Sequence, residues 1–318
     1  MGLSVQRVLL AAPRGYCAGV DRAVETVEQA LDRFGSPVYV RKQIVHNMHV
    51  VRDLESKGAI FVDELEQVPA GAHAILSAHG VAPEVYTEGR QRGLNVVDAT
   101  CPLVTKVHNE AKKFAGEGCH IVLIGHEGHE EVIGTMGEAP ASITLIGSPE
   151  EARTVTLPST DKVAYLSQTT LSVDETNEVI DALRERFPNI QAPPREDICY
   201  ATQNRQTAVK QLAKDADVVL VIGSENSSNS RRLAEVAAAG GASAHLIDDD
   251  TQIQERWLDG ARTVGITSGA SAPEWLVDRV VAWFRERGVE DIQEVTVVEE
   301  DVHFALPKEL SASPTRSA

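Results

Sequence analysis

Runs of apolar residues alternate along this chain with stretches in which apolar residues recur three or four positions apart, and short polar segments separate the two. The first run, Arg7 to Ala11, predicts a buried strand, and the helical pattern after it ends at Gly35. Further predicted strands cover residues 38–40, 59–62, 74–76, 94–97, 121–124, 163–166, 218–222, 264–266 and 295–298, and further helices cover 49–57, 86–91, 104–114, 174–187, 209–216 and 275–287. Strands that alternate with helices predict parallel sheets in an α/β fold.

A cysteine between the end of a strand and the start of a helix occurs three times, at Cys17, Cys101 and Cys199. A polar loop follows each cysteine after 29, 28 and 28 positions, and a second follows after 62, 68 and 72 positions; the loops contain His46, His129 and Ser227, and then His79, Thr169 and Ser271. Ligands of open α/β sheets bind at the carboxyl ends of the strands. The repeat therefore predicts three similar α/β domains with small parallel sheets, in a pseudo-threefold arrangement around a central cluster.

The predicted domain boundaries follow the cysteines. The first α/β domain covers residues 18–101 and the second covers 102–198, while the third combines 199–287 with 1–17. Residues 288–318 form a C-terminal strap and tail, in which 304–307 lie against the body and 311–318 are predicted to be disordered.

Composition and charge narrow the function classes. Hydrophobic residues make up 42% and charged residues 24% of the 318 positions, which is typical of a globular protein. The net charge of -17 argues against nucleic acid or an anionic membrane as the main partner. The apolar run at residues 8–12 is too short for a signal peptide or a membrane span, so we expect a cytoplasmic protein.

The cysteines suggest a metal centre, because four thiols far apart in a large chain make a poor disulfide framework. Three convergent thiolates at helix starts, where backbone N–H groups stabilise them, suit an iron-sulfur cluster or zinc. A four-iron cluster held by only three cysteines leaves one iron free to act as a Lewis acid. Cys119 has no counterpart in the repeat and is predicted to be a core residue.

The polar loops predict a cradle for phosphate or diphosphate that uses imidazoles, hydroxyls and amides rather than lysine or arginine. Its candidate members are His46, His79, His129, Thr169, Ser227, Ser228, Asn229 and Ser271. Glu131 lies beside this cradle, where a bound anion favours the protonated carboxyl group and equips it as a proton donor. The serine and asparagine run at 224–230 also fits a flexible loop or a helix N-cap before Arg231.

Nine motifs in one order make the chain resemble the 4-hydroxy-3-methylbut-2-enyl diphosphate reductases, the iron-sulfur enzymes of the last step of the non-mevalonate isoprenoid pathway. They lie at residues 13–21, 45–47, 77–81, 98–108, 128–132, 167–172, 197–202, 223–230 and 269–273. One position departs from the family, which usually has proline where Glu130 stands. Glu130 adds a negative charge and a freer backbone next to Glu131.

The resemblance implies one [4Fe-4S] cluster on Cys17, Cys101 and Cys199, whose unique iron binds the C4 hydroxyl group of the substrate. Two electrons from an external donor such as ferredoxin or flavodoxin, and two protons, then remove that oxygen as water and give isopentenyl or dimethylallyl diphosphate. By the same resemblance Glu131, Thr169 and His129 deliver protons. The diphosphate is held by His46, His79, His129, Ser227, Ser228, Asn229 and Ser271.

Two other functions fit parts of the pattern. The first is a non-catalytic metal-binding or redox-sensing protein whose three cysteines hold zinc or a labile cluster. The second is a phosphate-binding α/β module with inert cysteines. No dinucleotide fingerprint or Walker A sequence supports binding of a nucleotide or flavin.

Overall fold

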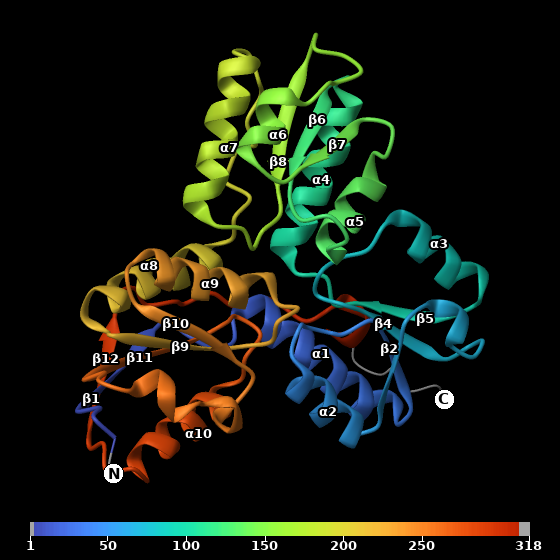
Figure 1. Ribbon diagram of the computed structural model, residues 1–318. Helices are drawn as coiled ribbons and strands as arrows, with labels where there is room; N and C mark the ends of the chain where they lie inside the picture. The colour runs from blue at the N-terminus through green and yellow to red at the C-terminus, as the bar shows by residue number, and fades with distance from the viewer. Residues whose placement is uncertain (1–2, 312–318) are drawn as a thin grey trace.

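The structure is a computed structural model that describes residues 3–311. Its strands form three separate parallel sheets, and each sheet with its helices makes one lobe of a three-lobed molecule (Figure 1). The lobes meet at a common centre, as the pseudo-threefold prediction requires. None of the helices in residues 3–311 combines the length and apolarity that a membrane-spanning segment needs.

The first lobe is built on a four-stranded sheet of order β3-β2-β4-β5. Its strands are β2 (Val38–Arg41), β3 (Ala59–Val62), β4 (His73–Leu76) and β5 (Asn95–Asp98), and its helices are α1 (Ala18–Phe34), α2 (Met48–Ser56) and α3 (Pro83–Gln91), with a short 3-10 turn η1 (Leu65–Gln67). The buried residues of α1 recur three or four positions apart, among them Val20, Ala23 and Val27, so this helix presents one apolar stripe to the sheet.

The second lobe has the smallest sheet, of order β7-β6-β8. Its strands are β6 (His120–Ile124), β7 (Ile143–Ile146) and β8 (Val163–Ser167), and its helices are α4 (Pro102–Gly116), α5 (Glu130–Glu138), α6 (Pro149–Thr154) and α7 (Val173–Arg186). Every residue of β6 and β8 is buried, because helices cover both faces of this parallel sheet.

The third lobe joins the two ends of the chain in a five-stranded sheet of order β10-β9-β11-β1-β12. Its strands are β1 (Arg7–Ala12), β9 (Val218–Ile222), β10 (Ser243–Ile247), β11 (Thr263–Ser268) and β12 (Asp291–Thr296); its helices are α8 (Tyr200–Asp215), α9 (Ser228–Ala239) and α10 (Glu274–Arg285), with 3-10 turns η2 (Asp250–Gln252) and η3 (Glu255–Leu258). The strand predicted at 295–298 is found earlier in the chain, and β12 extends the third sheet rather than standing apart as a strap.

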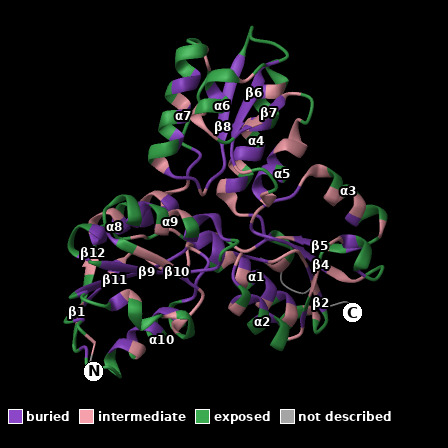
Figure 2. Cartoon of the chain, viewed as in Figure 1, coloured by how far each residue is buried: buried purple, intermediate pink, exposed green. Residues whose placement is uncertain are grey.

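Apolar residues fill both sides of each sheet. In the third lobe Val8, Leu220 and Ile266 belong to one core cluster, whereas Leu9 and Val219 belong to the cluster on the other face. Figure 2 shows a similar pattern in each lobe, where buried residues concentrate in the strands and the helices carry exposed residues on their outer faces. The alternation of side chains along a strand accounts for this division.

The C-terminal segment crosses from the third lobe to the first. The Arg22 guanidinium donates to the carbonyl oxygen of Ala305 at 2.8 Å, and Arg33 donates to that of Leu310 at 2.8 Å. Leu310 belongs to the short helix α11 (Lys308–Ser311) and packs on the core of the first lobe. Ala305, within the predicted strap at 304–307, thus contacts the first lobe. Of the predicted disordered tail, residues 312–318 lie outside the described residues.

Candidate active site

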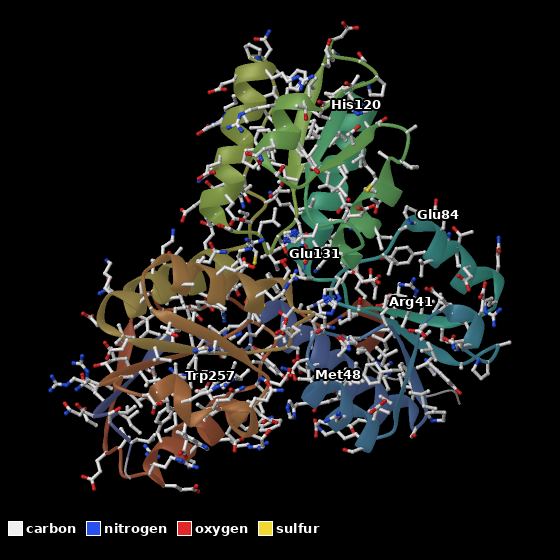
Figure 3. The ribbon with its side chains drawn as sticks, in the orientation of Figure 1. Arg41, Met48, Glu84, His120, Glu131 and Trp257 are labelled. Carbon is white, nitrogen blue, oxygen red and sulfur yellow. The ribbon has the colours of Figure 1, made fainter. Side chains whose placement is uncertain are left out.

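One cavity lies where the three lobes meet, and all twelve side chains selected from the sequence line it. They are Cys17, His46, His79, Cys101, His129, Glu131, Thr169, Cys199, Ser227, Ser228, Asn229 and Ser271. Figure 3 shows Glu131 at the base of the second lobe, facing this junction. The repeat read from the sequence therefore does bring residues from nearly the whole chain to one place.

The three cysteines occupy equivalent positions. Each is the N-cap residue of a helix, and none uses its side chain to cap that helix. Cys17 and Cys101 follow strands β1 and β5 as predicted, whereas Cys199 follows helix α7 and an irregular segment rather than a strand. Each backbone N–H also bonds to the polar loop of a neighbouring strand, where the acceptors are the carbonyl oxygens of Ala270, Ala78 and Thr169 at 3.3, 3.0 and 3.1 Å for Cys17, Cys101 and Cys199. The thiols are therefore held by matching backbone geometry and are free to bind another group.

Close packing around Gly19 shows that the sulfurs converge. A Cβ atom at Gly19 would lie 2.7 Å from Sγ of Cys101 and 3.8 Å from Sγ of Cys17, so only glycine fits. The Thr202 hydroxyl lies 3.2 Å from Sγ of Cys199. Within residues 3–311 no three His, Cys, Asp or Glu side chains are grouped tightly enough for one metal ion. In an iron-sulfur cluster each cysteine binds a different iron, so three spaced thiols with room between them fit such a group.

The protonation of the thiols differs from the sequence-based expectation of stabilised thiolates. Burial, together with the nearby thiol of Cys17, raises the pKa of Cys101 to about 12 and that of Cys199 to about 11. Backbone N–H groups at the helix starts act in the opposite direction but do not outweigh burial. A bound cation is what converts buried thiols of this kind to thiolates.

Among residues 3–311, Glu131 is the one carboxyl group that lines the cavity, and its side chain is held by Thr169. The backbone N–H and the hydroxyl group of Thr169 both donate to Oε2 of Glu131, at 3.0 and 2.9 Å. Burial raises the pKa of Glu131, whereas these two hydrogen bonds lower it. The predicted bias toward the protonated form is therefore present in the structure, but burial causes it.

Three histidines form an aromatic group on one side of the cavity. The rings of His46 and His79 stack with centroids 4.0 Å apart, and His129 approaches them edge-on at 5.5 and 6.0 Å. Burial and the adjacent imidazoles lower the pKa of His46 to about 4 and that of His79 well below its usual range. Burial, with His126 and Arg231, lowers the pKa of His129 to about 4.

The hydroxyl and amide side chains come mainly from the third lobe. Ser227 is the N-cap of α9 and accepts hydrogen bonds from the N–H and hydroxyl of Ser230, so the alternative prediction of an N-cap in this run is also correct. Asn229 uses Oδ1 to accept from the N–H of Ala270, and its buried Nδ2 has no hydrogen-bond partner in residues 3–311. The Ser271 hydroxyl donates to the carbonyl oxygen of His46 at 3.0 Å.

Glu130, the departure noted in the sequence, is the first residue of α5. Its Oε2 lies 3.8 Å from Nη1 of Arg41, which also forms a 2.7 Å ion pair with Glu64. Arg41 lies at the end of β2, on the side of the first lobe that faces the junction (Figure 3). The added negative charge is therefore partly balanced across the contact between the first and second lobes.

Comparison with known proteins gives a single family. The model of the LytB protein family matches residues 8–285, which include all twelve cavity residues selected from the sequence. This chain belongs to the LytB protein family. It is 62% identical over 309 residues to the 4-hydroxy-3-methylbut-2-enyl diphosphate reductase of Acidothermus cellulolyticus, covering 97% of this chain and 91% of the relative, and 62% identical over 306 residues to that of Leifsonia xyli, covering 96% and 91%.

Two solved structures share the fold. The E-1-hydroxy-2-methyl-but-2-enyl-4-diphosphate reductase from Plasmodium falciparum superposes with a TM-score of 0.93 at 36% identity, covering 96% of this chain and 97% of that one. A second structure, described as the terminal enzyme of the non-mevalonate pathway, gives a TM-score of 0.63 at 33% identity, covering 89% and 100%. The three-lobed α/β fold is thus shared with reductases of this family.

Sequence reasoning missed two hydroxyl side chains that also line the cavity, Thr170 and Thr202. Thr202 follows Cys199 by three positions, a helical spacing that places the two side chains on one face. That spacing was the available signal. Cys119 is buried among the apolar residues of the second lobe, which confirms its prediction as a core residue.

Proposed function

We propose that this chain catalyses the reductive removal of the 4-hydroxyl group from 4-hydroxy-3-methylbut-2-enyl diphosphate, giving isopentenyl and dimethylallyl diphosphate. The reaction consumes two electrons and two protons and releases the oxygen as water. The observation that carries the proposal is the convergence of three cysteines, Glu131 with Thr169, and a polar wall on one cavity. Relatives 62% identical to this chain are named as reductases of this substrate.

We infer that Cys17, Cys101 and Cys199 hold one [4Fe-4S] cluster. When bound, the cluster supplies electrons and one iron with an open coordination position for an oxygen ligand. Gly19 leaves room between two of the sulfurs, and the Thr202 hydroxyl supports the third. These contacts support a cluster site at the thiol end of the cavity.

Glu131 is the proposed proton donor, with Thr169 and His129 as its partners. Because both donors of Thr169 point at Oε2, a proton on the carboxyl group resides on Oε1. His129 is the N-cap of α5 and accepts at Nδ1 from the N–H of Glu131 at 3.2 Å, so it fixes the start of the helix that carries Glu131. The pair thus holds a proton at a defined atom beside the thiols.

We propose that the diphosphate lies against the imidazoles of His46, His79 and His129 and the polar groups of Ser227, Ser228, Asn229 and Ser271. No lysine or arginine is among the cavity-lining residues in the described part of the chain. Recognition then depends on neutral donors, of which the unpartnered Nδ2 of Asn229 is one. An anion here also favours protonation of the buried histidines, since it stabilises their charged form.

Two further proposals concern the setting of the reaction. We expect the chain to act in the cytoplasm and to receive electrons from a small donor protein of the ferredoxin or flavodoxin class. The reaction can be tested without the natural electron donor, because an artificial reductant can supply the two electrons.

Anaerobic purification followed by iron, sulfide and zinc analysis tests the cluster, and dithionite with a viologen mediator tests the reaction. We expect close to four iron and four sulfide per chain, following from one four-iron cluster, and conversion of the allylic diphosphate to both products. Stoichiometric zinc without sulfide would overturn the proposal in favour of a zinc protein. An intact cluster without turnover would instead indicate a redox sensor.

A further inference from the structure

A basic side chain follows each of the three cysteines on the helix that the cysteine caps. The separations are five, five and six positions, in the pairs Cys17 and Arg22, Cys101 and Lys106, and Cys199 and Arg205. The helices are α1, α4 and α8, the first helix of each lobe. The pattern therefore repeats with the lobes, although these side chains do not line the cavity.

The guanidinium of Arg22 binds the segment that leads into Cys101. Nη1 donates to the carbonyl oxygen of Thr100 at 3.0 Å, and Nη2 donates to that of Asp98 at 3.3 Å. Nε donates to the carbonyl oxygen of Ala305, so the same side chain also holds the C-terminal segment. The contacts to residues 98 and 100 span the exit from β5.

The ammonium group of Lys106 does the same for the segment that leads into Cys199. It donates to the carbonyl oxygens of Arg195 and Glu196 at 2.6 and 3.0 Å, and to Oδ1 of Asp197 at 2.8 Å. The Asp197 side chain is 1% exposed and also accepts from the N–H of Ser167, which ties this segment to the end of β8.

The guanidinium of Arg205 binds the segment that leads into Cys17. Nη2 donates to the carbonyl oxygen of Gly15 at 2.8 Å and to that of Tyr16 at 3.3 Å, and Nε donates to Gly15 at 3.3 Å. The Arg205 side chain is 0% exposed, and its only ion-pair partner among residues 3–311 is Glu300, at 3.1 Å. Burying a charge this deeply is unfavourable unless its donors are satisfied, as they are here.

These contacts close a ring around the cavity. The basic residue after Cys17 binds the segment before Cys101, the residue after Cys101 binds the segment before Cys199, and the residue after Cys199 binds the segment before Cys17. Each basic side chain binds the segment through which the chain leaves its own lobe for the next one. Backbone carbonyl groups in such a segment lie beyond the regular secondary structure and need other hydrogen-bond donors. The ring thus fixes the three thiols relative to one another.

Arg205 and Glu300 place two opposite charges next to the segment that carries Cys17. The Arg205 guanidinium donates to the carbonyl oxygen of Tyr16, the residue before Cys17, and Glu300 pairs with the same guanidinium at 3.1 Å. A cation and a carboxylate at this place have opposite effects on any negative charge that develops on the group bound at Cys17.

We propose that Arg22, Lys106 and Arg205 are positioning residues that hold the three cysteine-bearing segments at the spacing the cluster requires, and that Arg205 and Glu300 together set the reduction potential of that cluster. The inference rests on the proposed [4Fe-4S] cluster. Reduction adds a negative charge to the group bound at Cys17, so a nearby cation favours the reduced form and a nearby carboxylate disfavours it.

Potentiometric titration of the anaerobic holoenzyme, read by the electron paramagnetic resonance signal of the reduced cluster, tests the charge effect. We expect Glu300→Gln to raise the midpoint potential and Arg205→Gln to lower it, each by about a tenfold change in the reduced-to-oxidised ratio, which corresponds to about 59 mV for one electron. Opposite shifts from two residues in one ion pair distinguish a charge effect from general loosening. Midpoint potentials equal to that of the parent protein, or shifts of the same sign in both variants, would overturn the proposed charge effect of Arg205 and Glu300.

Two variants keep the test sound. Arg33→Gln is the matched control, because Arg33 also lies on α1 and donates to a C-terminal carbonyl oxygen, that of Leu310, away from the cavity; its potential should equal that of the parent. If Arg205→Gln does not fold, Arg205→Lys retains the charge but loses the forked geometry. The Arg205→Lys variant should keep the midpoint potential of the parent protein, while the backbone amide hydrogens of the Cys17 segment should exchange with solvent faster than in the parent.

Hydrogen exchange of the full-length protein tests the positioning role without reference to turnover. The N–H groups of Cys17, Cys101 and Cys199 are all hydrogen-bonded, so each reports on its own segment. We expect Arg22→Gln to increase exchange at 98–101 and Lys106→Gln to do so at 195–199, by about tenfold, while Arg33→Gln changes neither. Uniform exchange increases, or none, would contradict the positioning role.

These measurements separate the inference from the proposed function. A parent protein without iron and sulfide would defeat the cluster proposal, whereas a parent with a normal cluster and variants that match Arg33→Gln would defeat only the ring. The exchange measurements apply in either case.

Discussion

Cys17, Cys101 and Cys199 are held in the three lobes by nearly identical local structure, whereas the polar side chains that face them differ from lobe to lobe. Each thiol lies on an N-cap residue and each cysteine N–H bonds to a loop at the end of a neighbouring strand. The facing wall has two histidines from the first lobe, a histidine, glutamate and threonine from the second, and serines with asparagine from the third.

This difference follows from the shapes of the two ligands proposed for the cavity. A cluster bound through three equivalent irons has near-threefold symmetry, so one repeated unit can supply all its ligands. An allylic diphosphate has an anionic end and a reacting end, and its recognition requires unlike groups at fixed positions. The thiol end of the cavity therefore retains the repeat, while the polar end has lost it.

Cys101→Ser tests the thiol end most directly. A serine hydroxyl is a poor ligand for iron, so we expect loss of most cluster iron and a fall in turnover greater than the roughly 10–100-fold that loss of an outer-shell partner causes. Iron and sulfide analysis and turnover with dithionite measure the effect. Cys119→Ala is the control, since Cys119 lies in the core of the second lobe and should leave iron content unchanged. Full activity in Cys101→Ser would mean that the cysteines are inert.

Glu131→Gln tests the polar end. Glutamine keeps the shape and can still accept from Thr169, but it carries no exchangeable acidic proton, so turnover with an artificial reductant should fall by about 10²–10⁴-fold, with KM little changed. Undiminished turnover would show that another group donates the proton. Thr169→Val is the companion variant, because it removes one of the two hydrogen bonds to Oε2 while leaving the carboxyl group in place.

The same substitution predicts a change in stability with pH. Burial raises the pKa of Glu131 above its ordinary value of 4.5, so the folded protein retains this proton more strongly than the unfolded chain does. The associated stability is complete below pH 4.5 and is lost as the pH rises through the folded-state pKa. Thermal unfolding should show the parent losing stability relative to Glu131→Gln as the pH increases from about 4.5.

Much of the fold and of the candidate site can be predicted from the sequence, because buried strands leave a clear pattern of apolar residues. Strands buried on both faces, such as β6 and β9, give continuous apolar runs. Each of the three cysteines directly precedes a helix start. The roles of the twelve side chains stay predictions, but their meeting in one cavity follows from the equivalent positions of the loops.

The strands and helices that the sequence did not predict correctly have weaker patterns of apolar residues. Strands β7, β10 and β12 lie at the edges of their sheets, and most of their residues are only partly buried or exposed, so they lack a continuous apolar run. Helix α9 begins inside the serine and asparagine run, whose polar residues are buried at the cavity rather than exposed in a loop. The contacts of Arg205 were also unreadable, because they join residues 190 positions apart.

The buried histidines predict a moderate change in stability with pH, opposite in sign to that of Glu131. The pKa of His46 falls from 6.5 to about 4 on burial, so its contribution to stability is present above pH 6.5 and is lost as the pH falls toward 4. The lost stability amounts to about 3 kcal/mol for a shift of this size. His46→Asn should flatten the acid side of the thermal unfolding profile. His303→Asn, at a side chain that is 91% exposed, should leave the profile unchanged.

The smallest expected effect concerns Glu130, the first residue of α5 at the polar end of the cavity. Glu130→Pro should be nearly neutral, because proline is favourable at the first position of a helix and the N–H of Glu130 has no backbone acceptor among residues 3–311. The ion pair with Arg41 spans 3.8 Å and involves partly exposed side chains, so its loss should cost less than about 1 kcal/mol. The ion pair between Arg41 and Glu64 remains in both Glu130 variants. Comparison with Glu130→Gln, which removes only the charge, separates the two contributions in KM and in thermal unfolding. A change in KM above about threefold in Glu130→Pro but not in Glu130→Gln would show that the backbone freedom of this loop, rather than its charge, affects substrate binding at the polar end.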